Sequence, residues 1–141
     1  MKQSNLENSL YQNAAMGTYA IRQVLPKVSD GELKKELNKQ LNMYHNESNA
    51  VASSMRGNSN VPQRLPVMKR VMSKAGIAFE LARDNSSEHI AEMMIQGTNM
   101  GIIDINKALN GTKNLSPQAA KQAKEMLSRE QQYIDSLKRF L

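Results

Sequence analysis

Apolar residues recur along most of the chain at spacings of three and four, which is the periodicity of one face of an α-helix. Breaks in this pattern, together with residues that start or stop helices, divide the chain into five predicted helices. They cover about residues 5–28, 29–57, 67–84, 85–111 and 116–141. No segment shows sustained alternation of period two, so no strands are expected.

Short polar motifs mark the expected helix ends. In a capping box, two residues three apart each accept, through the side chain, a hydrogen bond from the other's backbone N–H. Capping boxes are predicted at Ser4 with Glu7, Ser29 with Glu32 and Asn85 with Glu88. Ser116 followed by Pro117 should open the last helix. Pro26 should fray or bend the last turn of the first helix, and Gly111 should end the fourth in the left-handed conformation.

The periodic positions predict which face of each helix points inward. For the first helix they are Leu6, Leu10, Asn13, Gly17, Ala20, Val24 and Val28, and for the second Leu33, Leu37, Gln40, Tyr44, Glu47, Val51 and Met55. For the third they are Met68, Met72, Ala75, Phe79 and Ala82, and for the fourth Ile90, Met94, Gly97, Gly101, Ile105 and Ala108. For the last they are Ala120, Ala123, Leu127, Glu130, Ile134, Leu137 and Leu141.

The connections limit the architecture to two all-α arrangements. The first two helices are joined almost directly, so they should pack antiparallel, while residues 59–66 form a genuine loop. The third helix, at roughly 1.5 Å per residue, is long enough to climb about 27 Å along a bundle. The chain is therefore either a plain five-helix bundle or a ferritin-like antiparallel bundle of four long helices with a shorter crossover helix.

Composition adds limits on the class of protein. The 141 residues fit one helical-bundle domain, residues 1–141, with 40% apolar residues, 10 Met and no Trp. The absence of Cys excludes disulfides and thiolate sites. No apolar signal core or membrane-length run is present, so a cytoplasmic protein without membrane association is expected. The net charge of +6 is spread over separate basic pairs, which indicates a solvated surface and leaves nucleic-acid binding as an alternative.

Several segments resemble a known family. The runs DGELKKEL at residues 30–37, QL at 40–41 and YHNE at 44–47 resemble the second helix of small, uncharacterised bacterial ferritin-like domains, and they are also similar to spore coat F proteins. The run SEHIAEMMIQG at 87–97, the turn before Ser116 and residues 130–137 resemble the third and fourth helices of those domains. This resemblance implies a ferritin-like bundle.

The metal ligands of such bundles are largely missing. Metal-binding members use one carboxylate from each of two helices and a Glu-x-x-His pair from each of the other two. Glu47 and Glu130 occupy the glutamate positions, but Ala50 and Tyr133 stand where the histidines belong. Asn13 on the first helix and Gln96, Gly97 and Gly101 on the fourth replace the single carboxylates. No metal or other cofactor is therefore expected, and any metal would rest on the two glutamates alone.

The two glutamates are instead predicted to be buried and satisfied by neighbouring polar groups, or to reach solvent at the bundle edge. The residues expected in this polar interior are Asn13, Gln40, Tyr44, Glu47 and Glu130, with Gly97 beside them. His45 and His89 are predicted to lie at the surface or at its boundary with the core, and the serines are explained as helix caps. No catalytic residue is predicted from this pattern.

The stretch of residues 93–103 is apolar around more than one face of its predicted helix, whereas packing in the core requires only one. Met93, Met100 and Ile103 are therefore candidates for a homodimer or partner interface, with core filling as the alternative. The expectation is a non-catalytic bundle that acts through protein contacts, structural or spore-associated. A degenerate metal-binding or oxidoreductase protein using Glu47 and Glu130 is the alternative.

Overall fold

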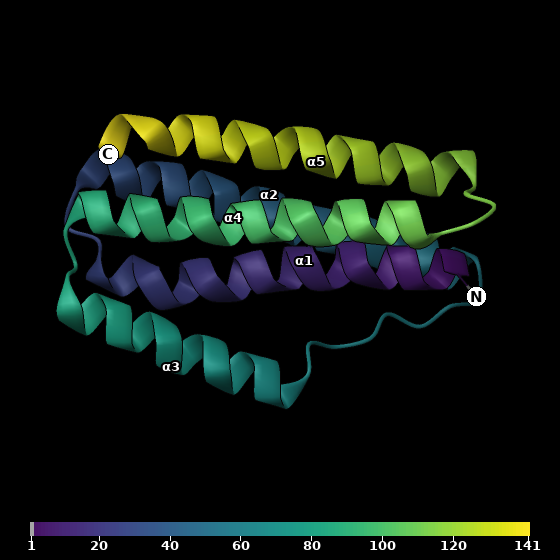
Figure 1. The fold of residues 1–141 in the computed structure, drawn as a ribbon, viewed down its shortest axis with the longest axis horizontal. Coiled ribbons are helices and arrows are strands. Elements are labelled where there is room, and N and C mark those ends of the chain that lie inside the picture. Colours follow the sequence, from purple (N-terminus) through teal and green to yellow (C-terminus); the bar gives the residue numbers. More distant parts are fainter. Residues whose placement is uncertain (1) are drawn as a thin grey trace.

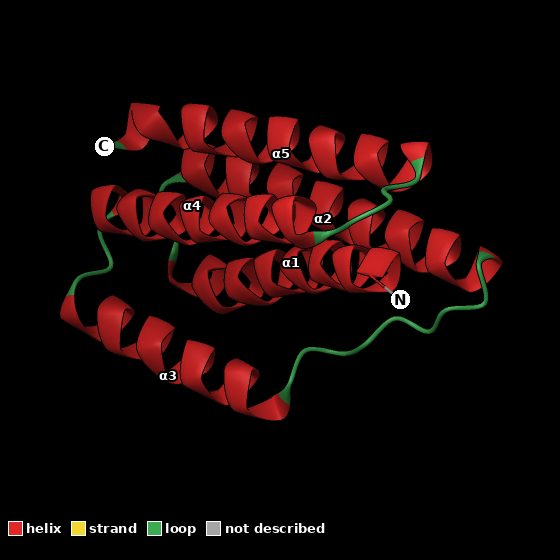
Figure 2. Ribbon diagram, turned by 45° about the vertical axis from the view of Figure 1, so that its right-hand side comes forward, coloured by secondary structure: helices red, strands yellow, loops and turns green. Residues whose placement is uncertain are grey.

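The computed structural model describes residues 2–141, with side chains from residue 5 onward. It contains five α-helices: α1 (Lys2–Val24), α2 (Gly31–Gly57), α3 (Val67–Arg83), α4 (Ser87–Gly111) and α5 (Pro117–Leu137). Short 3-10 helices follow α1 (Leu25–Lys27) and α5 (Lys138–Phe140). Figure 2 shows no strand among these residues, which confirms the all-α prediction.

Four of the helices pack side by side. α1 and α2 form one antiparallel pair and α4 and α5 another, and α1 contacts α4 while α2 contacts α5. The chain returns from the end of α2 to the start of α4 through residues 58–66 and α3, so α2 and α4 run in the same direction (Figure 1). α3 lies outside the four and packs mainly against α1.

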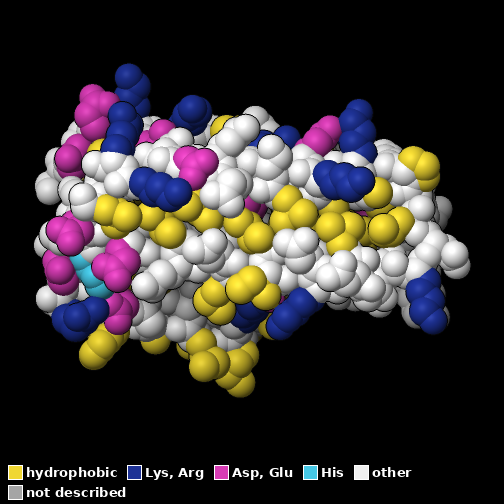
Figure 3. Space-filling model, turned by 45° about the horizontal axis from the view of Figure 1, so that its top comes forward, with side chains coloured by type: hydrophobic (Ala, Val, Ile, Leu, Met, Phe, Trp, Pro, Cys, Tyr) yellow, Lys and Arg dark blue, Asp and Glu magenta, His cyan; other side chains and the backbone are white. Residues whose placement is uncertain are grey.

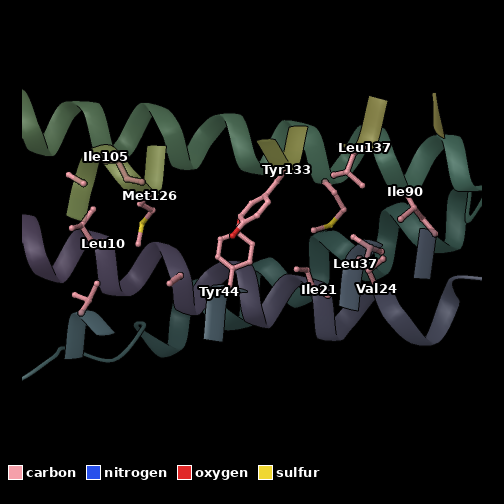
Figure 4. Packing of buried hydrophobic residues seen from close by; sticks show 14 of the residues in the cluster. Leu10, Ile21, Val24, Leu37, Tyr44, Ile90, Ile105, Met126, Tyr133 and Leu137 are labelled. Carbon is pink, nitrogen blue, oxygen red and sulfur yellow. The ribbon is translucent and has the colours of Figure 1, made fainter. Parts of the chain in front are cut away.

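The core lies between α1, α2, α4 and α5 and consists largely of aliphatic side chains (Figure 4). All seven positions predicted for α2, from Leu33 to Met55, are buried. α2 therefore presents one continuous face to α1 and α5. Burying each large aliphatic side chain of this kind contributes about 1.5–3 kcal/mol. Among residues 2–141, no helix is both long and apolar enough to cross a membrane.

Several helix ends differ from the predictions. α1 already begins at Lys2, so Ser4 stands within the helix, and its side chain lies outside the described part. Asp30, rather than Ser29, caps α2, because its carboxylate accepts bonds from the N–H groups of Glu32 and Leu33. Ser86, rather than Asn85, caps α4 through the N–H of His89.

Of the other end predictions, two are confirmed and one is wrong. Ser116 caps α5 through the N–H of Ala119 at 3.1 Å. The 3-10 turn at Pro26 marks the frayed end of α1. Gly111 is not left-handed, because the described glycines have no positive φ; Asn114, three residues later, takes a φ of 57°.

The inward faces of α4 and α5 are turned slightly from the predicted ones. On α4, Gly97 is exposed and Thr98 is buried in its place. On α5, Ala119, Met126 and Tyr133 are buried, whereas Ala120 and Leu127 are only half-buried. Leu141 is exposed, because the chain leaves the helix before it. Both helices carry apolar residues on two adjacent stripes. Spacing alone does not tell which of the two stripes faces the core.

The predicted inward face of α3 is wrong. Met68, Met72, Ala75, Phe79 and Ala82 are exposed, and the opposite side of the helix, with Ile77 and Leu81, packs against the bundle. The end of the helix is correct to within one residue. The periodicity therefore identified an apolar face, but nothing among the described residues covers it.

Candidate functional site

Glu130 is the centre of a group of polar side chains inside the bundle. The carboxylate of Glu130, on α5, has no exposed surface. Its Oε1 accepts a hydrogen bond from Asn13 Nδ2 of α1 at 2.5 Å, and its Oε2 accepts one from the Tyr44 hydroxyl of α2 at 2.7 Å. Both carboxylate oxygens are thus satisfied by this chain, as a buried charged group requires.

Glu47, on α2, has a different set of partners. Its Oε1 accepts hydrogen bonds from Arg129 Nε at 2.9 Å and from the Tyr133 hydroxyl at 2.8 Å, both from α5. Its Oε2 is buried and has no hydrogen-bond partner among the described residues. The guanidinium of Arg129 reaches solvent, so this carboxylate sits closer to the edge of the bundle than Glu130.

The two glutamates are linked by a reciprocal exchange between α2 and α5. Tyr44 and Glu47 are one turn apart on α2, and Glu130 and Tyr133 are one turn apart on α5. Because the helices are antiparallel, each tyrosine reaches the glutamate of the other helix. The two rings meet edge to face with centroids 5.0 Å apart (Figure 4). We call this group the polar layer; its members are Asn13, Tyr44, Glu47, Arg129, Glu130 and Tyr133.

Two glycines make room for the polar layer. A Cβ at Gly17 would lie 2.7 Å from the ring of Tyr44, and a Cβ at Gly101 would collide with the Asn13 carboxamide oxygen. Both positions lie inside helices, where glycine costs about 0.5–1 kcal/mol relative to alanine. The absence of a side chain at Gly101 thus lets Asn13 lie against α4.

Burial dominates the electrostatics of the polar layer. Desolvation raises the pKa of Glu130 to about 7, although its hydrogen bonds from Tyr44 and Asn13 act in the opposite direction. Desolvation also raises the pKa of Glu47, opposed by Tyr133 and Arg129. The pKa values of Tyr44 and Tyr133 are raised as well, first by burial and then by the nearby carboxylates. Near neutral pH, Glu130 is therefore protonated in some molecules and ionised in others.

The arrangement offers little to an external substrate. Glu130 has no exposed surface, and its oxygens are already paired with side chains of the chain itself. A depression of about 250 Å³ lies elsewhere, lined by Asn5, Leu6, Ser9, Ala108, Gly111 and Thr112. It contains no member of the polar layer and no acidic or basic side chain.

The structure brings most of the predicted polar residues together. Asn13, Tyr44 and Glu130 are in direct contact, whereas Glu47 pairs with Arg129 and Tyr133 instead. Gln40 is buried and donates to Glu36 and to the Tyr133 carbonyl oxygen. Gly97 lies on the outside, so its predicted place beside them is wrong.

Two members of the polar layer, Arg129 and Tyr133, were not proposed as partners from the sequence. The sequence did contain an indication for Tyr133, because it stands three residues after Glu130, where a metal-binding bundle has an inward-facing histidine. Nothing in the sequence indicated a buried partner at Arg129, since an arginine on a helix is usually solvated. Among the described side chains, those of residues 5–141, no three His, Cys, Asp or Glu are placed to hold a metal ion.

The histidines and the interface candidates take separate places. His45 is exposed, whereas His89 is largely buried, with Nε2 2.9 Å from a carboxylate oxygen of Glu80 on α3. Met100 and Ile103 are 67% and 52% exposed, and Met93 is half-buried against the core. The α4 surface thus keeps two of its three predicted apolar positions accessible.

Comparison with protein-family models, curated proteins and solved structures found no match to this chain. The polar layer and the exposed apolar faces of the bundle are therefore the features from which its function is inferred.

Proposed function

We propose that this chain is a non-catalytic, ferritin-like helical bundle that acts through protein contacts, with a structural or spore-associated role. The observation that carries the proposal is the pairing within the polar layer. The carboxylate oxygens of Glu130, and one of those of Glu47, accept hydrogen bonds from Asn13, Tyr44, Arg129 and Tyr133. Carboxylate oxygens that already accept hydrogen bonds from the chain's own side chains offer few open positions to a ligand.

Two further features support the proposal. The return of the chain from α2 to α4 through one long connection is the connectivity expected of a ferritin-like bundle. Exposed apolar side chains are also numerous: Figure 3 shows a band of them along one face and a separate group at the lower margin, where α3 lies. Such surfaces are typical of contact sites with other proteins.

A second candidate, a degenerate metal site using Glu47 and Glu130, draws on a single observation. Glu47 Oε2 is buried without a hydrogen-bond partner among the described residues. An ion or a water molecule bound there would satisfy it. The other three carboxylate oxygens are already engaged, so this candidate has less support.

Photo-crosslinking in the cells that produce the protein tests the proposed function. A photoreactive amino acid is placed at Met72 on α3, at Met100 on α4 and, as a control, at Lys124 on the charged side of α5; all three positions are exposed. We expect a discrete crosslinked protein from at least one methionine position and none from Lys124. Crosslinks from none of the three positions would contradict action through protein contacts.

A further inference from the structure

The outer face of α3 is the largest set of exposed apolar side chains on one helix of the described structure. Val67, Met68, Val71, Met72 and Phe79 are each between 59% and 71% exposed. Met68, Met72, Ala75, Phe79 and Ala82, which we call the α3 stripe, are spaced four, three, four and three residues apart. This is the spacing with which one helix presents a narrow apolar face to another helix.

Basic side chains border the α3 stripe. α3 contains Lys69, Arg70, Lys74 and Arg83 against the single acid Glu80, which gives the helix a charge of 4 − 1 = +3. Lys69 and Arg83 follow stripe residues by one position and so lie along one edge, while Lys74 lies towards the other. Glu80 is already engaged by Arg83 at 2.6 Å and by His89.

This charge selects among possible occupants. A second copy of the chain, docked stripe to stripe, would bring two helices of +3 together, with lysines facing lysines along the edges. An occupant with carboxylates beside its apolar face would instead be attracted to Lys69 and Lys74, since Arg83 is already paired with Glu80. Charge complementarity therefore favours an acidic partner over self-association.

The sizes of the side chains along α3 favour a helix over a membrane as the occupant of the stripe. Small residues, Ala75, Gly76 and Ala78, lie between the bulky Met72 and Phe79. A Cβ at Gly76 would meet no atom within 4 Å, so nothing inside the protein requires glycine there. Small side chains let a second helix approach closely and receive its large side chains. They add little to membrane insertion, which relies on large side chains such as Trp, Phe and Leu.

We propose that the α3 stripe binds an acidic amphipathic helix of a protein partner. The apolar face of that helix packs on Met68, Met72 and Phe79, and its Asp or Glu side chains lie along Lys69 and Lys74. The closest approach is at Ala75 on the stripe and at Gly76, which follows it on the edge that carries Lys69. This inference rests on the proposed function, since it names the surface and the kind of partner through which the bundle acts.

Two synthetic helical peptides test the proposal on the full-length protein. Both carry Leu at the a and d positions of a heptad repeat; one has Glu at all e and g positions and the other has Lys. We expect the Glu peptide to bind at least about tenfold more tightly in fluorescence anisotropy, with an affinity that falls as salt is added. Phe79→Ser should weaken that binding by about tenfold or more, because a large apolar contact is lost.

Two glycine variants provide a matched pair. Gly76→Ala and Gly97→Ala both add a methyl group in open space at an exposed position inside a helix, on α3 at the edge of the stripe and on α4. Both should raise the urea midpoint of the free protein through helix propensity. Only Gly76→Ala should weaken binding of the Glu peptide, because only that methyl group enters the contact. Unchanged binding by Gly76→Ala would overturn the proposed geometry.

Other outcomes would also overturn the proposal. These are binding of neither peptide, equal binding of both, or binding that survives Phe79→Ser. So would Phe79-dependent binding to phosphatidylserine vesicles without binding of the Glu peptide, or a Phe79-dependent dimer in light scattering. Crosslinks from Met100 but not from Met72 would contradict this inference and remain consistent with the proposed function. Crosslinks from neither position would contradict both.

Discussion

Raising the pH from 5 to 8 is expected to lower the free energy of unfolding of this protein by on the order of 3 kcal/mol through Glu130 alone. Burial raises the pKa of Glu130 from 4.5 to about 7 in the folded state. Between these values the native state holds a proton that the unfolded chain releases. Stability from this group is therefore complete below pH 4.5 and is lost as the pH rises through 7. The raised pKa of Glu47 acts in the same direction.

Glu130→Gln should remove most of this pH dependence, because glutamine resembles the protonated acid and still accepts the bond from Asn13. Urea unfolding at pH 5 and pH 8 measures the effect. We expect the variant to match the wild type at pH 5 and to be more stable by about 2–3 kcal/mol at pH 8. Glu125→Gln, at an exposed position on the same helix, is the control and should change neither value. A wild-type protein that gains stability from pH 5 to 8 would refute this description of the polar layer.

The second large effect separates two apolar positions that look alike in the sequence. Leu37 on α2 is fully buried, whereas Phe79 on α3 is 68% exposed. Leu37→Ala should lower the free energy of unfolding by about 3 kcal/mol through lost burial and the cavity left behind. Phe79→Ala should change it by no more than about 0.5 kcal/mol, as at other surface positions.

Urea denaturation of both variants at one pH gives the comparison. A loss at Phe79 as large as that at Leu37 would mean that α3 turns its apolar face inward. That result would remove the surface on which the proposed contact with an acidic helix depends, and it would restore the arrangement that periodicity alone predicts.

The sequence predicted α2 most completely, and the reason is physical. Its apolar and polar positions at Leu33, Tyr44 and Met55 form one stripe, and the helix packs between neighbours that cover that stripe. α3 has an equally regular stripe, but periodicity states only that a face is apolar. What covers a face depends on how the chain crosses the bundle, and residues 58–66 carry α3 to its outer side.

The candidate site was predictable in part. Spacing placed Glu47 and Glu130 on inward faces, because each stands in a run of apolar residues at helical intervals. Their partners could not be assigned, since the rotation of α5 that buries Tyr133 depends on packing against α2. Similar ambiguity affected the helix caps: Ser29 and Asp30 are adjacent capping residues, and Asp30 prevails by accepting two backbone bonds.

The central claim is that the carboxylates of the polar layer are held by the protein's own side chains. Its most direct test is the urea midpoint of the wild type and of the Glu47→Gln/Glu130→Gln variant, measured in EDTA and with Fe²⁺, Mn²⁺ or Zn²⁺. A metal bound by the native state at 100 times its dissociation constant would add about 2.7 kcal/mol. We predict the same midpoint with and without metal in both proteins. A metal-dependent rise in the wild type that the variant lacks would contradict the claim.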